Sequence, residues 1–204
     1  MTFYELAPSP NNIKVRLALR AKGIPFEAVP VDPRDRSRVR EVSGQDLTPV
    51  VADKGIVLND SEAILNFLDA NYDGPRLMPA DREGRYACDA WKERLDRELA
   101  RHWLGPFFYA IGLRPEFDPA DRSAFQDALG VLDAELGERD SFHDDPTRRV
   151  CDLRVAEWAC YALPGEGLIA RVPLFAKFRE VYAVPEGRCA NLERFLRPWN
   201  EFLA

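Results

Sequence analysis

The chain has 204 residues, 46% of them hydrophobic, which is enough to bury a sizeable core as one compact unit or two small domains. Its formal net charge of −6 argues against a nucleic-acid-binding protein, because phosphate contacts need a basic surface. No apolar run approaches the roughly 18–20 residues of a membrane helix, and the first residues lack the pattern of a signal peptide, so we expect a cytoplasmic protein without a membrane partner.

The first residues predict a strand followed by a helix. Residues 3–6 read as the strand, 7–10 as a loop, and about 11–22 as a helix that stops before Gly23, where a left-handed residue commonly ends helices. The apolar content of the helix comes from Val15, Leu17, Leu19 and Ala21. Its wetter positions are predicted to be Lys14, Arg16 and Arg20.

The next segments complete an alternating pattern. A second strand is expected around residues 26–31, at a sheet edge because it contains Pro30, and a short charged helix around 34–42. Residues 50–58 read as a hairpin that turns at Gly55. A further helix begins near Asp60. The predicted order is therefore β-α-β-α-β-β-α.

Beyond a loop rich in glycine and proline, at about residues 74–79, the pattern is helical throughout. Helices are predicted at about 82–103, 119–138, 150–163, 174–181 and 192–203. Among the four cysteines, Cys88, Cys151 and Cys160 fall within such segments, where a buried free thiol acts as a small apolar residue. The cysteines form no CxxC pair and the two histidines lie outside any ligand spacing, so no metal site is expected.

Three motifs of the first half occur in a fixed order. A Ser9-Pro10 pair precedes the first helix, Leu47-Thr48-Pro49 precedes the hairpin, and Asn59-Asp60-Ser61 opens the following helix. In this order and spacing the motifs resemble the cytosolic glutathione transferase superfamily, in its bacterial, serine-type form. The resemblance covers essentially the whole chain, although only the first half carries recognisable motifs. It implies a thioredoxin-like glutathione-binding domain over residues 1–79, followed by an all-helical domain over 82–204.

The resemblance implies that Ser9 is the catalytic residue and faces the glutathione sulfur. A hydroxyl at a helix N-terminus would donate a hydrogen bond to the thiolate, and the helix dipole would add positive potential. Ser9 followed by Pro10 is also an ordinary helix cap with proline at the first helical position, and this alternative stays open. Tyr4 is a poor substitute for the tyrosine of other members, because strand alternation turns it to the other face.

The resemblance also assigns the remaining glutathione contacts. Thr48 and Pro49 would share a cis peptide bond and align the cysteinyl backbone of glutathione as a short extra strand. Asp60 and Ser61 would hold the γ-glutamyl end, although the family more often has Glu-Ser there and capping alone also explains this pair. Asn11 is a secondary contact that could instead complete the cap.

The second substrate would be an electrophilic small molecule, in a detoxification-type transfer, with glutathione as the co-substrate and no metal. Its pocket would lie on the helices after the linker, with Trp103, Phe107 and Phe108 as apolar walls, although aromatic clusters are more often core. Family members are usually homodimers. The alternatives are another glutathione-dependent reaction, such as isomerisation, and a non-catalytic interaction or stress protein that keeps only the fold.

Overall fold

The sheet of the N-terminal half has the strands that the sequence predicts. The computed structural model describes residues 1–204, with β1 at Thr2–Glu5, β2 at Glu27–Pro30, β3 at Val50–Asp53 and β4 at Ile56–Leu58. The spatial order is β2-β1-β3-β4; β1 pairs parallel to β2 and antiparallel to β3, and β3 pairs antiparallel to β4. Pro30 therefore lies on an edge strand, as predicted. The hairpin turns at Lys54 and Gly55, both with positive φ.

Three helices cover this sheet, and the predicted order β-α-β-α-β-β-α is confirmed. They are α1 (Pro10–Ala21), α2 (Ser37–Ser43) and α3 (Ser61–Asn71). Alternation along β1 sends Phe3 into the main core with α1 and α3, and Tyr4 into a separate cluster with Val39 of α2. Tyr4 is thus turned away from the face that carries α1, as expected.

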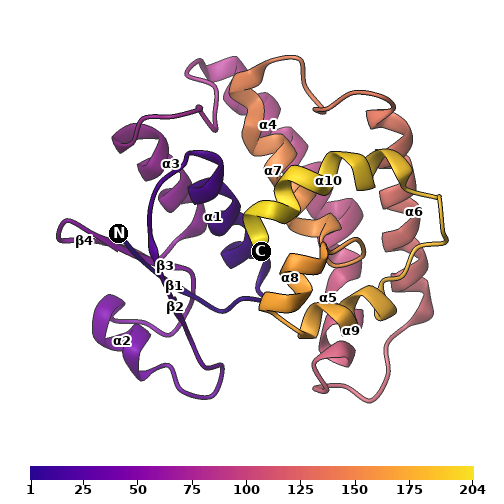
Figure 1. Ribbon diagram of the computed structural model, residues 1–204, viewed down its shortest axis with the longest axis horizontal. Helices are drawn as coiled ribbons and strands as arrows, with labels where there is room; N and C mark the ends of the chain where they lie inside the picture. The colour runs from indigo at the N-terminus through magenta and orange to yellow at the C-terminus, as the bar shows by residue number, and fades with distance from the viewer.

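The prediction that Lys14 and Arg16 lie at wetter positions of α1 is wrong, because each is only 4% exposed. Helix α1 packs against the sheet and α3 of its own half. It also packs against two helices of the C-terminal half, α7 (Arg149–Ala159) and α10 (Ala190–Leu203) (Figure 1). Two charges therefore enter the interior, where they need partners. Arg16 forms an ion pair with Glu5, whose carboxylate also accepts a hydrogen bond from Arg171 at 3.3 Å.

The C-terminal half is entirely helical and lies beside the sheet half (Figure 1). Besides α7 and α10 it comprises α4 (Arg82–Leu95), α5 (Arg101–Ala110), α6 (Pro119–Leu136), α8 (Glu166–Arg171) and α9 (Leu174–Val181). A π-helical segment, η1 (Asp96–Ala100), joins α4 to α5, and a 3₁₀ turn, η2 (Pro146–Arg148), precedes α7. The helix expected to end near Trp103 runs on to Ala110 past Pro106, and α8 is an element that the pattern did not predict.

One hydrophobic core joins the two halves. It contains 45 buried residues, from Phe3 of β1 to Leu203 of α10. Helix α7 is the most enclosed element, with every residue from Val150 to Ala159 buried. Cys88, Cys151 and Cys160 are buried free thiols, as the sequence predicts, and so is Cys189, for which no prediction was made. Each helix in the structure is too short or too polar to cross a membrane.

Candidate functional site

Ser9 stands at the N-cap position of α1, but its side chain does not cap the helix. Its backbone is extended, with φ −79° and ψ 132°, and Pro10 occupies the first helical position. The hydroxyl makes no capping hydrogen bond, and the residue is only partly buried. The ordinary reason for a serine here is therefore missing. A free donor stands at the positive end of a twelve-residue helix, where an anion is favoured.

The loop that carries Ser9 is held from two sides. From the helical half, the Tyr161 hydroxyl donates a 2.5 Å hydrogen bond to the Pro8 carbonyl. From α1, the Asn12 amide oxygen accepts from the backbone N–H of Leu6 at 3.1 Å, and its Nδ2 donates to Thr48 Oγ1 at 3.1 Å. Asn12 is fully buried. It thus ties the Ser9 loop to the segment that precedes β3.

The Thr48-Pro49 peptide bond is cis, as predicted. Thr48 is half-buried, and only its side chain takes part in a hydrogen bond within the chain; its backbone N–H and C=O are unpaired. An unpaired donor and acceptor on one residue beside a strand is a site where an extended peptide can add by backbone pairing. The segment therefore offers a short edge to a peptide-like ligand.

Asp60 and Ser61 begin α3 in different ways. The exposed Asp60 caps the helix, accepting from the Ala63 N–H at 2.8 Å through one carboxylate oxygen. Ser61 is buried, and its hydroxyl donates to Asn11 Oδ1 at 3.2 Å and accepts from Lys14 Nζ at 3.3 Å. Asn11 is exposed and also accepts from Lys14. Asn11 thus joins Ser61 rather than completing the cap of α1.

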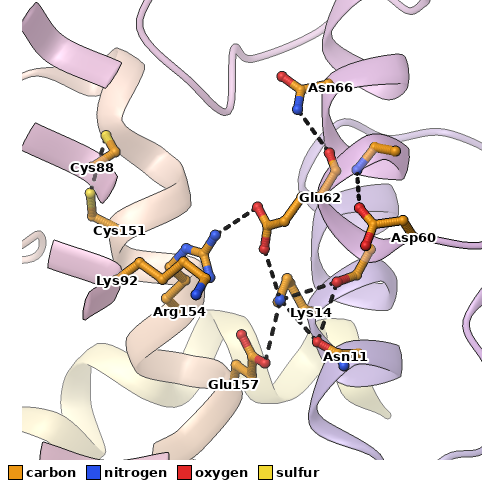
Figure 2. A network of polar contacts seen from close by, with 12 residues as sticks. Asn11, Lys14, Asp60, Glu62, Asn66, Cys88, Lys92, Cys151, Arg154 and Glu157 are labelled. Atoms are coloured by element: carbon orange, nitrogen blue, oxygen red, sulfur yellow. Dashed lines mark hydrogen bonds and ion pairs between the residues drawn. The ribbon is translucent and has the colours of Figure 1, made fainter. Parts of the chain in front are cut away.

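Behind these residues lies an interface network of Lys14, Glu62, Arg154 and Glu157, which connects α1 and α3 to α7 (Figure 2). Lys14 Nζ is 3.0 Å from Glu62 and 3.8 Å from Glu157, and Arg154 is 2.7 Å from Glu62. Burial acts to raise the pKa of Glu62, but the two cations outweigh it and the pKa is lowered. Burial raises the pKa of Glu157 to about 7, against the opposing pull of the same cations.

An aromatic cluster of Trp103, Phe107, Tyr161 and Phe178 lies next to the Ser9 loop. Phe107 stacks on Trp103 with ring centroids 4.2 Å apart and on Phe178 with centroids 5.3 Å apart. Tyr161 packs edge-on against Trp103 with ring centroids 5.3 Å apart. Of the predicted pocket residues, Trp103 is buried in this cluster, whereas Phe107 and Phe108 are half-buried. Tyr161 connects the cluster to the loop through its hydroxyl.

The residues that the sequence predicts thus fall into connected groups. Thr48 is linked to the Ser9 loop through Asn12, while Asn11 and Ser61 are in direct contact. The sequence did not single out Asn12 or Tyr161 as site residues. Asn12 stands in the first turn of the helix that follows Ser9-Pro10. Asparagine is a weak helix former there, and this was the available signal. No pattern distinguished Tyr161 from other core aromatics.

Together these groups suit an extended, peptide-like ligand with charged ends. The Ser9 hydroxyl and the N-terminus of α1 can bind an anionic group of such a ligand, and the Thr48 backbone can pair with its main chain. The polar side chains at the start of α3 can bind its charged end. The structure contains no group of three or more His, Cys, Asp or Glu side chains placed to hold a metal ion.

Comparison with known proteins matches residues 3–76 to the family described as glutathione S-transferase, N-terminal domain. A probable glutathione S-transferase of Nicotiana tabacum is 26% identical, over 96% of this chain and 87% of that protein. A maleylpyruvate isomerase of Ralstonia sp. is 32% identical, over 75% of this chain and 79% of the relative. The crystal structure of a glutathione S-transferase domain-containing protein from Marinobacter aquaeolei VT8 superposes with a TM-score of 0.67 at 23% identity, covering both chains fully.

Proposed function

This chain belongs to the cytosolic glutathione transferase superfamily, and from that premise we propose that it binds glutathione and activates its thiol for attack on an electrophilic carbon of a small molecule. The observation that carries the proposal is the Ser9 hydroxyl, which stands at the N-terminus of α1 without a capping bond. In this reading the hydroxyl donates a hydrogen bond to the glutathione sulfur.

Stabilising the sulfur as an anion is the chemical task of this site. A free thiol has a pKa of about 8.5, so most of it is protonated at neutral pH, whereas the thiolate is the nucleophile. The Ser9 hydroxyl and the dipole of α1 both favour the thiolate, and the thiol proton leaves to solvent. The sulfur lone pair then forms the new bond to carbon as the leaving group departs.

The rest of glutathione would extend along the residues already described. The Thr48 N–H and C=O, unpaired in the structure, would pair with the cysteinyl main chain beside Pro49. Ser61 and the N-terminus of α3 would receive the γ-glutamyl carboxylate, and the free oxygen of Asp60 its amino group. Asn11 would support Ser61 from the side.

The electrophile would bind over the helical half, next to the sulfur. Phe107 and Phe108 are half-buried and suit an apolar wall, with the buried Trp103 behind them. A cytoplasmic location and a symmetric homodimer complete the proposal, since both are usual for this superfamily.

A second candidate, isomerisation, is favoured by the 32% identity to the Ralstonia maleylpyruvate isomerase. An isomerase would add the thiolate to a double bond and later eliminate it, so glutathione would be regenerated. Against it, the zeta-type isomerase members of the superfamily have a serine and a cysteine where this chain has Pro10 and Asn11. The two reactions separate by stoichiometry, because conjugation consumes one glutathione per turnover and isomerisation consumes none.

The test combines a thermal-shift titration with glutathione and conjugation assays on a panel of electrophiles. Millimolar glutathione should raise the melting temperature of the wild type. The Ser9→Ala variant should retain that shift and lose about 10²-fold or more in kcat, because it removes one donor to the developing anion. Ser123→Ala, which removes an exposed hydroxyl on α6, is the matched control and should keep full activity.

The outcomes distinguish the rival functions. No stabilisation by millimolar glutathione would refute both the transferase and the isomerase and favour a non-catalytic protein. Binding together with unchanged turnover in Ser9→Ala would remove Ser9 from the mechanism.

A further inference from the structure

We propose that Cys88 and Cys151 form a redox-active dithiol, which a small-molecule disulfide such as glutathione disulfide oxidises to an intramolecular disulfide between α4 and α7. Neither cysteine is among the residues of the proposed glutathione site, and the proposal does not depend on the proposed transferase activity.

The two sulfurs are already in contact. Cys151 Sγ donates a hydrogen bond to Cys88 Sγ at 3.4 Å, across the packed surfaces of α4 and α7 (Figure 2). A disulfide bond is about 2.05 Å long, so the sulfurs must approach by about 1.4 Å. The two helices are also tied together nearby, because the Trp91 side chain of α4 donates through Nε1 to the Cys151 carbonyl at 3.2 Å. We expect side-chain rotation with a small adjustment of the helices to close the remaining gap.

The other two thiols provide an internal contrast. Cys160 is fully buried and donates to the Glu157 carbonyl at 3.3 Å, and Cys189 is fully buried at the start of α10. Neither has a second sulfur as its hydrogen-bond partner. Burial raises the pKa of both thiols, as expected for inert structural cysteines.

Within the pair, access favours Cys88. Cys88 is 6% exposed and lines a cavity of about 360 Å³ between α3 and α4, whereas Cys151 is 1% exposed and does not line it. Two cations, Arg85 and Lys92, line the same cavity with the anionic Glu62 and Asp89. Lys92 is already paired with Asp96, and Glu62 with Lys14 and Arg154. Arg85 and Asp89 therefore remain as the cationic and anionic partners for a carboxylate and an amino group of a peptide disulfide.

Acidity favours the same sulfur. The hydrogen bond from Cys151 lowers the pKa of Cys88, in spite of its burial, and the nearby Arg148 adds to this effect. The same hydrogen bond, together with burial, raises the pKa of Cys151. The thiolate is the species that attacks a disulfide. Cys88 is therefore the attacking sulfur and Cys151 the resolving one.

The reaction proceeds by two exchanges. The Cys88 thiolate attacks one sulfur of glutathione disulfide, forming a Cys88–glutathione mixed disulfide and releasing one glutathione thiolate. Cys151 then gives up its proton, its sulfur attacks Cys88 Sγ, and the second glutathione leaves. In total two protein thiols lose two electrons and two protons, and one small disulfide is reduced to two thiols. Excess reduced glutathione reverses both steps.

Intact-mass analysis and peptide mapping of the folded protein, equilibrated with glutathione disulfide, test this proposal. The wild type should lose two hydrogens in mass, keep two titratable thiols of its four cysteines, and yield a peptide cross-linked between Cys88 and Cys151. The Cys151→Ser variant should stop at one glutathionyl group on Cys88. Cys88→Ser should remain unmodified, and the control Cys160→Ser should cross-link like the wild type.

The wild-type peptide map decides the question even where a variant fails to fold. A wild type that retains four free thiols under these conditions, or that carries a glutathionyl group on Cys88 beside a free Cys151, would overturn the proposal. The same holds for equal modification of Cys88→Ser and Cys151→Ser, because the two sulfurs would then have no distinct roles.

Discussion

Two unlike regions at the contact between the halves of the molecule are the interface network and the aromatic cluster. The interface network joins α1 and α3 to α7 with four charged side chains, and it supports Ser61 and Asn11. The aromatic cluster joins the helical half to the Ser9 loop through one hydroxyl on an apolar body. Support of the first kind depends on charge and pH, whereas support of the second kind depends on shape and one neutral hydrogen bond. Each end of the proposed ligand site is thus held by a different kind of interaction.

The largest effect is expected from Lys14→Met, which removes the central cation of the interface network while keeping an unbranched apolar chain in its place. Glu62 and the fully enclosed Glu157 lose a partner, and breaking a buried ion pair costs about 3–5 kcal/mol. Urea unfolding at pH 7 measures the loss.

The matched control is Lys177→Met, because Lys177 pairs with Glu180 at 3.0 Å on an exposed surface. Its loss should change stability by about 0–1 kcal/mol. Equal losses in Lys14→Met and Lys177→Met would contradict the structural role assigned to the interface network.

A smaller effect is expected from the titration of Glu157. Its pKa is raised from 4.5 to about 7 in the folded protein, so between these values the folded state binds more protons than the unfolded state. Stability from this group is therefore greatest at low pH and is lost as the pH rises from about 4.5 towards 7, by an amount of order 1–3 kcal/mol. The opposite trend comes from Glu62, whose lowered pKa adds stability that is lost in acid.

Unfolding free energies of the wild type and Glu157→Gln, measured at several pH values across that window, isolate the contribution of Glu157. The difference between the two proteins should change steadily from pH 4.5 to 7 and then level off. A difference that stays constant over the window would show that Glu157 does not titrate there.

The smallest effect on stability is expected from Tyr161→Phe, which keeps the ring in the aromatic cluster and removes only the hydrogen bond to Pro8. The loss should be about 0.5–1.5 kcal/mol. If the hydrogen bond positions Ser9, the apparent pKa of bound glutathione should also rise and kcat should fall, while KM for glutathione stays nearly constant.

Tyr182→Phe is the control, because the Tyr182 hydroxyl makes an equally short 2.5 Å bond, to the Trp103 carbonyl, away from the Ser9 loop. It should show a similar loss of stability without the change in the pKa of bound glutathione. Identical pH profiles in the two variants would mean that Tyr161 has only a structural role.

The features that the sequence could predict are local ones. The resemblance to the superfamily implied the cis peptide before Pro49, whereas local signals found the edge strand with Pro30, the hairpin at Gly55 and the serine before α1. These features depend on a few neighbouring residues. The roles of Ser9, Asn11, Thr48, Asp60 and Ser61 towards a ligand are still predictions.

The features that the sequence could not predict depend on packing between distant segments. Lys14 is predicted to be solvated because charged residues usually mark the exposed face of a helix. In the structure α7 and α10 cover that face of α1. Tyr161 lies 153 residues from Pro8, and Cys88 lies 63 residues from Cys151. Neither pairing produces a periodic pattern in the sequence, because each depends on how whole helices pack against one another.

The main hydrophobic core, which spans both halves of the chain, determines how the molecule unfolds. Because the buried residues from Phe3 to Leu203 form one continuous cluster, neither half can be removed without exposing apolar surface on the other. The chain should therefore unfold in one cooperative transition rather than in two separate ones. Cleavage of the connecting segment between α3 and α4 would leave two pieces that stay associated, each depending on the other for its fold.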